Sequence, residues 1–367
     1  MLIVVKIGSS SITTDLGEVN ETAIAKLCAE ISEQIGNGNQ IVIVTSGAIA
    51  AGVEATGQFR KRPSDIETLQ ASASVGQPKL MRVYGKWLAR FGLVLGQILL
   101  APNDFSDRRQ YLQARKTIGR LLELGVVPII NENDAIADEE IRFGDNDRLA
   151  ALVAHMIKAD QLILLTDTAG LYSADPRFNR NVSLIEEIQE ISKELEAVAS
   201  SSGSEVGSGG MASKLAAAKI ASWSGIKVVI CDSKRSSVLA DAISGAEGVG
   251  TIVHPSERKL SSRKLWLAFA VVANGKIIID QGAATALIER GTSLLPAGVT
   301  GAVGDFENQD AVEIESTQGH LVGRGIVNCS AKQLESILGK KTSDIQGDFP
   351  EEVVHRDNMV VFSETNS

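Results

Sequence analysis

Short, continuous apolar runs that each end in small or polar residues constrain the fold of this chain more than any other feature. Between them lie segments with helical periodicity. In residues 24–35 the Ile and Leu side chains fall on one face, and Gly36 and Gly38 follow. Apolar strands that alternate with amphipathic helices are typical of an α/β domain with a mostly parallel sheet. The runs expected to form strands are residues 2–7, 41–44, 93–100, 126–130, 161–165 and 226–231.

The composition and the charge agree with such a domain and disfavour some partners. Aromatic residues make up only 4% of the chain, so the core must consist of Val, Ile, Leu and Ala, as in parallel strands covered by helices. A length of 367 residues exceeds one ordinary core and predicts two domains. The formal net charge of −9 does not favour nucleic acid or an anionic membrane as the main partner.

The cysteines and the N-terminus favour a cytoplasmic protein. Cys28, Cys231 and Cys329 lie far apart and form no CxxC pair, so neither a disulfide framework nor a zinc site is expected. The N-terminal apolar run lacks a charged segment and a cleavage site, and we interpret it as a strand and not as a signal peptide. No apolar stretch approaches the ~20 residues that a membrane-spanning helix needs. The four histidines have no metal-ligand spacing, and no protein metal site is predicted.

The character of the sequence changes near residue 255. Residues 256–264 are polar and basic, as a linker would be, and the strand-like and helix-like pieces beyond are short. We therefore predict a large α/β domain followed by a small β-rich domain. The predicted bounds are 1–254 for the first domain, 255–274 for the linker, 275–357 for the second domain and 358–367 for a tail.

Polar residues follow four of the predicted strands, beginning at Lys6, Thr45, Asn131 and Thr166. In open α/β sheets, ligands bind outside the carboxyl ends of the strands. Because parallel strands bring these ends to one edge, the sequence predicts a single active site there.

Two segments of the sequence have features that favour phosphate binding. A lysine followed by a Gly/Ser turn at Lys6 can bring an ammonium and backbone amides to phosphate oxygens, although a lysine reaching out from an edge strand would look the same. Residues 207–214 (GSGGMASK) open a helix, whose first amides attract anions. The helix dipole opposes a cation at Lys214, which indicates a phosphate nearby; the alternative is a loop leading into a surface helix. There is no GxxxxGK[ST] motif.

Residues 131–134 (NEND) and 144–147 (GDND) carry carboxylates and amides that could hold a zwitterionic amino acid or organise Mg²⁺ around phosphates. Either segment alone could equally be an Asx-rich turn. A carboxylate acceptor, with a solution pKa of about 4.3, would be ionised at neutral pH and would need no general base. Catalysis would then depend on positioning and on charge compensation by lysines and Mg²⁺.

The motifs VVKIGSSSI, IVIVTSGAIAAG, PIINENDA, FGDNDRLAA, LLTDTAGLYSADPR and GSGGMASKLAAAKIA resemble, in order and spacing, those of glutamate 5-kinases of the amino acid kinase superfamily. They span essentially the first 230 residues, and residues 282–298 look like the start of a PUA domain. The resemblance implies a three-layer sandwich with a mostly parallel sheet, followed by a small β-rich PUA-like domain. It also implies the family's reaction, in which ATP phosphorylates L-glutamate to L-glutamyl 5-phosphate in the first step of proline synthesis, with Mg²⁺ bound mainly through the ATP phosphates.

The resemblance assigns a role to each motif. Lys6 and Lys214 would contact the transferring phosphoryl group, and Asp147 would orient both lysines. Glutamate would be bound by Ser46, Gly47, Asp134 and Asn146. The nucleotide would be bound by Lys6, Gly8, Thr166, Asp167, Ser208, Gly209, Gly210, Met211, Ala212, Ser213 and Lys214.

The family is typically inhibited by L-proline and is oligomeric, so a homodimer or homotetramer is expected. A sister enzyme that phosphorylates another carboxylate or a nucleotide remains an alternative, although N-acetylglutamate would offer no α-ammonium to Asp134. RNA binding through the second domain is not expected, because residues 275–357 contain 7 Lys and Arg against 13 Asp and Glu. A catalytically inactive amino acid sensor is not supported, since both lysines and Asp147 are present.

Overall fold

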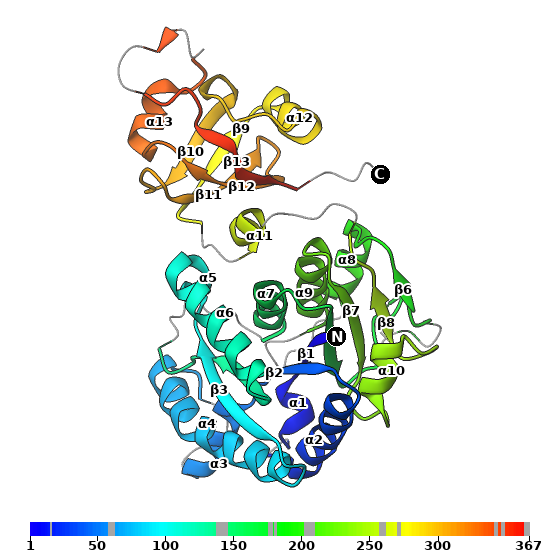
Figure 1. Cartoon of the computed structure of the whole chain (residues 1–367). Coiled ribbons are helices and arrows are strands. Elements are labelled where there is room, and N and C mark those ends of the chain that lie inside the picture. The colour runs from blue at the N-terminus through cyan, green and yellow to red at the C-terminus, as the bar shows by residue number, and fades with distance from the viewer. Residues whose placement is uncertain are drawn as a thin grey trace. The chain divides into compact units, whose positions relative to one another are not determined.

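The computed structural model divides the chain into two compact units, Met1–Lys259 and Leu260–Ser367 (Figure 1). Each unit has its own sheet and its own core. No helix among the described residues is both long enough and apolar enough to cross a membrane. The structure describes residues 1–14, 17–57, 63–136, 146–174, 179, 182–201, 210–256, 262–269, 273–340, 344–345 and 349–362.

The first unit is built on an eight-stranded sheet with the strand order β3-β4-β2-β1-β5-β7-β8-β6. All neighbouring strands are parallel except β7 and β8, which confirms the predicted mostly parallel sheet. The sequence predicted six of these strands to within two residues at either end and missed the two short ones, β6 and β8. The strands are β1 (Leu2–Ile7), β2 (Gln40–Val44), β3 (Val94–Leu100), β4 (Val126–Glu132), β5 (Gln161–Thr166), β6 (Glu187–Ile188), β7 (Lys227–Asp232) and β8 (Thr251–Val253).

Helices cover both faces of this sheet, which makes three layers (Figure 1). On β1, Ile3, Val5 and Ile7 belong to a core shared with α2, α4 and α10, and the residues between them point to the other face. Lys6 therefore lies on the face that α7 covers. The helices are α1 (Ser9–Ile12), α2 (Glu21–Gly36), α3 (Ala48–Thr56), α4 (Ile66–Ala89), α5 (Pro102–Ser106), α6 (Arg108–Glu123), α7 (Asn146–Ile157), α8 (Lys193–Ser201), α9 (Met211–Trp223) and α10 (Val238–Ser244).

Helices α3 and α4 cross in direct backbone contact. A Cβ atom on Gly52 would lie 1.7 Å from the Ser72 carbonyl oxygen, and one on Gly76 would lie 1.8 Å from the Ala48 carbonyl oxygen. No side chain fits in either place, so only glycine permits this crossing. The crossing fixes the position of α3, which begins directly after Ser46 and Gly47 at the end of β2.

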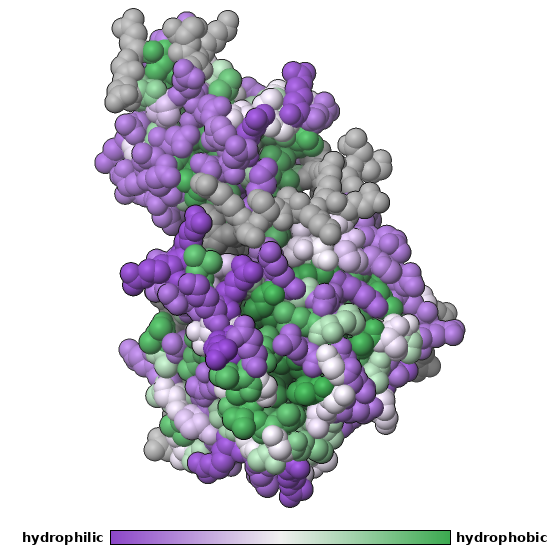
Figure 2. Space-filling model, viewed as in Figure 1, coloured by the Kyte–Doolittle hydropathy of each residue, from purple (hydrophilic) through white to green (hydrophobic). Residues whose placement is uncertain are grey.

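The second unit contains a five-stranded sheet with the order β10-β9-β11-β12-β13, in which only β9 and β11 are parallel. This confirms a small β-rich fold, and the face seen in Figure 2 carries mainly hydrophilic residues. Its elements are α11 (Ser262–Phe269), β9 (Gly275–Ile279), α12 (Gln281–Arg290), the 3₁₀ helix η1 (Pro296–Gly298), β10 (Val299–Gly304), β11 (Ala311–Ser316), β12 (Leu321–Val327), α13 (Ala331–Ile337) and β13 (Val354–Val361).

The structure differs from the predicted linker at residues 255–274. Helix α11 occupies part of that stretch, and Leu267 and Ala268 pack against Ile326 and Val360 of the second sheet. The Nη1 atom of Arg324 also donates a hydrogen bond to the carbonyl oxygen of Ala268, at 3.2 Å. The basic, Ser-rich composition suggested a linker because Ile326 and Val360, which cover these apolar side chains, lie far along the chain.

The predicted tail at 358–367 also needs correction. Strand β13 runs through Val361, and Met359 and Val360 are each only 2% exposed. Residues 355–358 (HRDN) are polar and suggested that the domain had ended, but they lie within the edge strand of the sheet. The second sheet thus extends at least to residue 361.

Candidate active site

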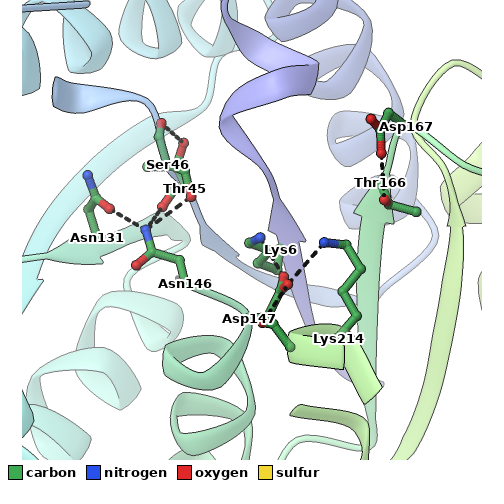
Figure 3. Close-up of polar contacts among 10 residues, drawn as sticks. Lys6, Thr45, Ser46, Asn131, Asn146, Asp147, Thr166, Asp167 and Lys214 are labelled. Atoms are coloured by element: carbon green, nitrogen blue, oxygen red, sulfur yellow. Dashed lines mark hydrogen bonds and ion pairs between the residues drawn. The ribbon is translucent and has the colours of Figure 1, made fainter. Parts of the chain in front are cut away.

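The carboxyl ends of β4, β2, β1 and β5 lie side by side at one edge of the first sheet, as the parallel order requires. Figure 3 shows the polar side chains that these ends carry. Ser46 and Asn146 lie on one side of Lys6, and Thr166 and Asp167 lie on the other. The site is therefore arranged as a row whose centre is Lys6.

Two lysines share one buried carboxylate at the centre of the row. Asp147, in the first turn of α7, is completely buried and forms an ion pair with Lys6 through Oδ1. Its Oδ2 atom lies 3.1 Å from Nζ of Lys214 and accepts a hydrogen bond from Oγ of Ser213 at 3.2 Å. Lys6 and Lys214 are 3% and 6% exposed, so one carboxylate holds two positive charges away from bulk water.

The charge state of this triad follows from its surroundings. Burial alone would raise the pKa of Asp147, but the ammonium groups of Lys6 and Lys214 outweigh burial and hold the pKa below its usual value. Asp147 is thus ionised at neutral pH. With both lysines protonated, the triad carries one net positive charge, which suits a phosphate group.

Lys214 is the fourth residue of α9, where the helix dipole disfavours a cation. The sequence suggested a phosphate as the compensating anion. The structure shows that Asp147 of α7 already supplies a negative charge, so the position of Lys214 does not by itself require a ligand.

The N-terminus of α9 adds amide donors beside the lysines. Its N-cap residue, Gly210, makes no side-chain cap, and the first turn contains no acidic residue. The first amides of a helix, here from Met211, have no acceptor within the helix and can bind an anion. Of the predicted phosphate-binding segment, Ser208 and Gly209 lie outside the described residues.

A cluster of amide and hydroxyl groups lies on the β2 and β4 side. The Nδ2 atom of Asn146 is 2.5 Å from the Thr45 carbonyl oxygen, 2.7 Å from Oδ1 of Asn131 and 3.1 Å from Oγ of Ser46. Ser46 and Asn146, both predicted to bind the substrate, are therefore in contact. Gly47 follows with φ +93° as the N-cap of α3, a conformation that favours glycine.

The remaining predicted residues lie at the same edge. Asp134 is half-buried in the turn after β4. Thr166 ends β5 and donates from Oγ1 to Oδ1 of the exposed Asp167, at 3.1 Å. Gly8 follows β1, and a Cβ atom placed on it would lie 3.7 Å from Nζ of Lys6, so the chain passes close to that ammonium.

Sequence reasoning missed Gln77 and Tyr84 of α4. Gln77 accepts from Nδ2 of Asn131 at 2.8 Å, and the hydroxyl of Tyr84 lies 3.1 Å from Oγ1 of Thr45. Both side chains are buried. The sequence did offer a signal for Gln77, because it is a glutamine on the apolar face of an amphipathic helix. A buried amide of this kind needs a hydrogen-bond partner.

Comparison with known proteins identifies the class first. Residues 1–232 match the amino acid kinase family, and residues 275–348 match the PUA domain. The first match covers more than half of the chain, which therefore belongs to the amino acid kinase family and is a kinase. An X-ray structure of isopentenyl phosphate kinase is similar, with 18% identity, a TM-score of 0.49, and coverage of 69% of this chain and 100% of that one.

Curated relatives narrow the class. A glutamate 5-kinase from Thermoanaerobacter sp. (strain X514) is 42% identical over 365 residues, which are 98% of this chain and 98% of that protein. A glutamate 5-kinase from Chromobacterium violaceum is 44% identical over 362 residues, with 98% and 97% coverage. Within the superfamily, the chain belongs to the glutamate 5-kinase family, and the resemblance noted from the sequence motifs is confirmed.

Proposed function

We propose that this protein transfers the γ-phosphoryl group of ATP to the γ-carboxylate of L-glutamate, giving L-glutamyl 5-phosphate and ADP in the first step of proline biosynthesis. The observation that carries this proposal is the buried triad of Lys6, Asp147 and Lys214 between two different polar groups. One side offers amides and hydroxyls for an amino acid, and the other offers Thr166, Asp167 and the N-terminus of α9 for a nucleotide.

In this mechanism Lys6 and Lys214 contact the transferring phosphoryl group and compensate the charge that spreads over its oxygens. Asp147 does not touch the substrate and acts as the positioning residue that keeps both ammonium groups together. Ser46, Asn146, Asp134 and the Gly47 amide hold glutamate. The acceptor carboxylate is ionised at neutral pH, so no general base is needed.

The nucleotide would be held by Gly8, Thr166, Asp167 and residues 208–214. Mg²⁺ would be held mainly by the ATP phosphates, where it offsets their negative charge. Asp147 fits the role of lysine anchor better than that of metal ligand, because its oxygens already contact Lys6, Lys214 and Ser213.

The test is ADP release from ATP and Mg²⁺ with L-glutamate, N-acetylglutamate, L-aspartate and UMP, in the presence of hydroxylamine to trap an acyl phosphate. We expect turnover with L-glutamate alone and formation of the hydroxamate. Turnover with another member of the panel and none with L-glutamate would move the chain to a sister enzyme of the same family.

The proposal includes a homo-oligomer, either a dimer or a tetramer. Strand β3 is an edge of the first sheet, and Val94 on it is 63% exposed. Phe91 and Leu124, which lie in the turns before β3 and β4, are 43% and 59% exposed. Figure 2 shows further apolar residues gathered at the surface of this unit. Exposed apolar groups beside a sheet edge favour association. Light scattering of the intact protein tests this part.

The proposal also includes inhibition by L-proline and a cytoplasmic location. Proline has the α-carboxylate and the ammonium of an amino acid, the groups that the glutamate side of the site would bind. Cys28, Cys231 and Cys329 are unpaired and buried, as suits a reducing compartment. The acidic composition of the second unit does not favour RNA as a partner.

A further inference from the structure

A chain of buried side-chain amides leads from α4 to the predicted glutamate site. Nε2 of Gln77 lies 3.3 Å from Oε1 of Gln97, and Oε1 of Gln77 accepts from Nδ2 of Asn131 at 2.8 Å. Oδ1 of Asn131 in turn lies 2.7 Å from Nδ2 of Asn146. Gln77, Asn131 and Asn146 are 7%, 1% and 8% exposed, so water cannot readily replace these contacts.

Two backbone groups fix the direction of this chain. The Glu132 N–H can only donate, and it lies 2.9 Å from Asn131, so the Asn131 atom that faces it must be the oxygen. The Thr45 carbonyl can only accept, and it lies 2.5 Å from Asn146, so the Asn146 atom that faces it must be the nitrogen. The orientation of both amides thus follows from chemistry and not from a choice between similar atoms.

The orientation of Asn131 then determines that of Gln77. With its oxygen towards Glu132 and Asn146, Asn131 presents its NH₂ group to α4, and only an acceptor satisfies that group. A reversed Asn131 would place its oxygen against Oε1 of Gln77 and its NH₂ group against the Glu132 N–H, so both of these contacts would become repulsive. Gln77 therefore makes the reversed state costly.

The far end of the chain is the Asn146 oxygen. The Asn146 nitrogen lies within hydrogen-bonding distance of oxygens of Thr45, Ser46 and Asn131. Figure 3 shows the Asn146 oxygen on the opposite side of the amide from these contacts. A carbonyl oxygen accepts hydrogen bonds and does not donate them, so it suits the ammonium of an amino acid and not its carboxylate.

We infer that Gln77 is a positioning residue for glutamate: through Asn131 it holds the Asn146 amide with its oxygen towards the substrate ammonium. This inference rests on the proposed function. Gln77 itself does not contact glutamate, so its removal must act through Asn146 and must leave the ATP side of the site unchanged.

The experiment is a double-mutant cycle in the full-length protein with Gln77→Met and Asn146→Ala, measuring kcat and the KM values for glutamate and ATP. Methionine keeps the length of the side chain and removes the acceptor. We expect Gln77→Met to raise the glutamate KM at least about fivefold, with kcat and the ATP KM within about twofold of wild type. The double variant should match Asn146→Ala within about twofold, because the two residues act in series.

Val83→Ala is the matched control. It removes buried apolar contacts of the same helix, in the core of the first unit, and Val83 has no part in the amide chain. It should lower the melting temperature and leave the glutamate KM within about twofold of wild type. If Gln77→Met is too unstable to assay, Gln77→Glu keeps an oxygen for Asn131 and should preserve the glutamate KM, because the exposed Gln97 can turn its NH₂ group towards the second carboxylate oxygen.

Several outcomes overturn the inference: an unchanged glutamate KM in Gln77→Met, a parallel rise in the ATP KM, effects that multiply in the double variant, or a raised glutamate KM in Gln77→Glu. Each of these requires a wild-type protein that turns over glutamate. A wild-type protein without that activity contradicts the proposed function first, and the role of Gln77 falls with it.

Discussion

Gly52 of α3 and Gly76 of α4 face each other where the two helices cross, so closely that a Cβ atom on Gly76 would lie 2.4 Å from the Gly52 nitrogen. Helix α3 begins with Ala48, directly after Ser46 and Gly47. Gly52 and Gly76 lie away from the residues proposed to contact the reactants. Their close approach nevertheless determines where α3 begins within the site.

Gly76→Ala should therefore affect both stability and substrate binding. The methyl group overlaps backbone atoms, so the helices must separate, at a cost of about 3 kcal/mol or more. We expect a lower melting temperature and a raised glutamate KM. Gly119→Ala in α6 is the control, because nothing lies within 4 Å of the added carbon and alanine favours a helix by about 1 kcal/mol. Equal behaviour of the two variants would contradict the packing argument.

Asp147→Asn should separate the two lysines. The change leaves two buried ammonium groups without a counter-charge, and breaking a buried ion pair costs about 3–5 kcal/mol. We expect a large fall in melting temperature and in kcat. Glu123→Gln breaks the exposed pair with Arg120 and should cost less than about 1 kcal/mol. A normal kcat in Asp147→Asn would remove the triad from the mechanism.

Lys214→Ala and Asp134→Ala should affect different kinetic constants. Lys214 contacts the phosphoryl group in the proposed mechanism, so its loss should lower kcat by orders of magnitude while glutamate binding is largely kept. Asp134 would pair with the glutamate ammonium under the same proposal, so its loss should chiefly raise the glutamate KM. If Asp134→Ala changed only the KM for ATP, the assignment of the substrate side would be wrong.

Two truncations test the end of the second sheet. A chain that stops after residue 357 loses the buried Met359 and Val360 of β13, which pack on the sheet. We expect faster proteolysis of the second unit and a lower melting temperature. A chain that stops after Phe362 keeps the whole strand and should resemble the full-length protein, and the two would behave alike if the strand contributed nothing.

His155 predicts a pH-dependent stability. Burial, followed by repulsion from Arg115 and Lys158, lowers its pKa to about 4 from 6.5. Between these values the unfolded chain binds a proton that the folded chain does not, so stability falls as the pH is lowered from 6.5 towards 4, by at most about 3 kcal/mol. The melting temperature of wild type should therefore fall relative to that of His155→Gln as the pH is lowered from 6.5 towards 4. His254→Gln, at a histidine of the same unit whose side chain is 34% exposed, is the control. A constant difference between wild type and His155→Gln would contradict the prediction.

The sequence predicted the parts of the site that depend on local pattern. Apolar strands with Lys6, Ser46 and Thr166 at or just beyond their carboxyl ends needed only the rule that parallel strands share an edge. The supporting layer could not be predicted in the same way, because Gln77 has meaning only through Asn131, 54 residues away in the chain. Helix α11 and strand β13 were missed for a similar reason: their apolar residues find their partners through tertiary packing alone.

Asn146 and Asp147 are neighbours in the chain, yet under the proposed function they serve different reactants. Asn146 faces the amino acid, and Asp147 anchors the lysines at the phosphoryl group. Consecutive Cα atoms are about 3.8 Å apart, and both residues belong to the first turn of one helix. Under that proposal, the distance from the ammonium of the acceptor to its reacting carboxylate has to match this rigid spacing. An acceptor shorter by one methylene, held at its ammonium, would then fall short of the phosphoryl group, so the start of α7 would select substrates by length.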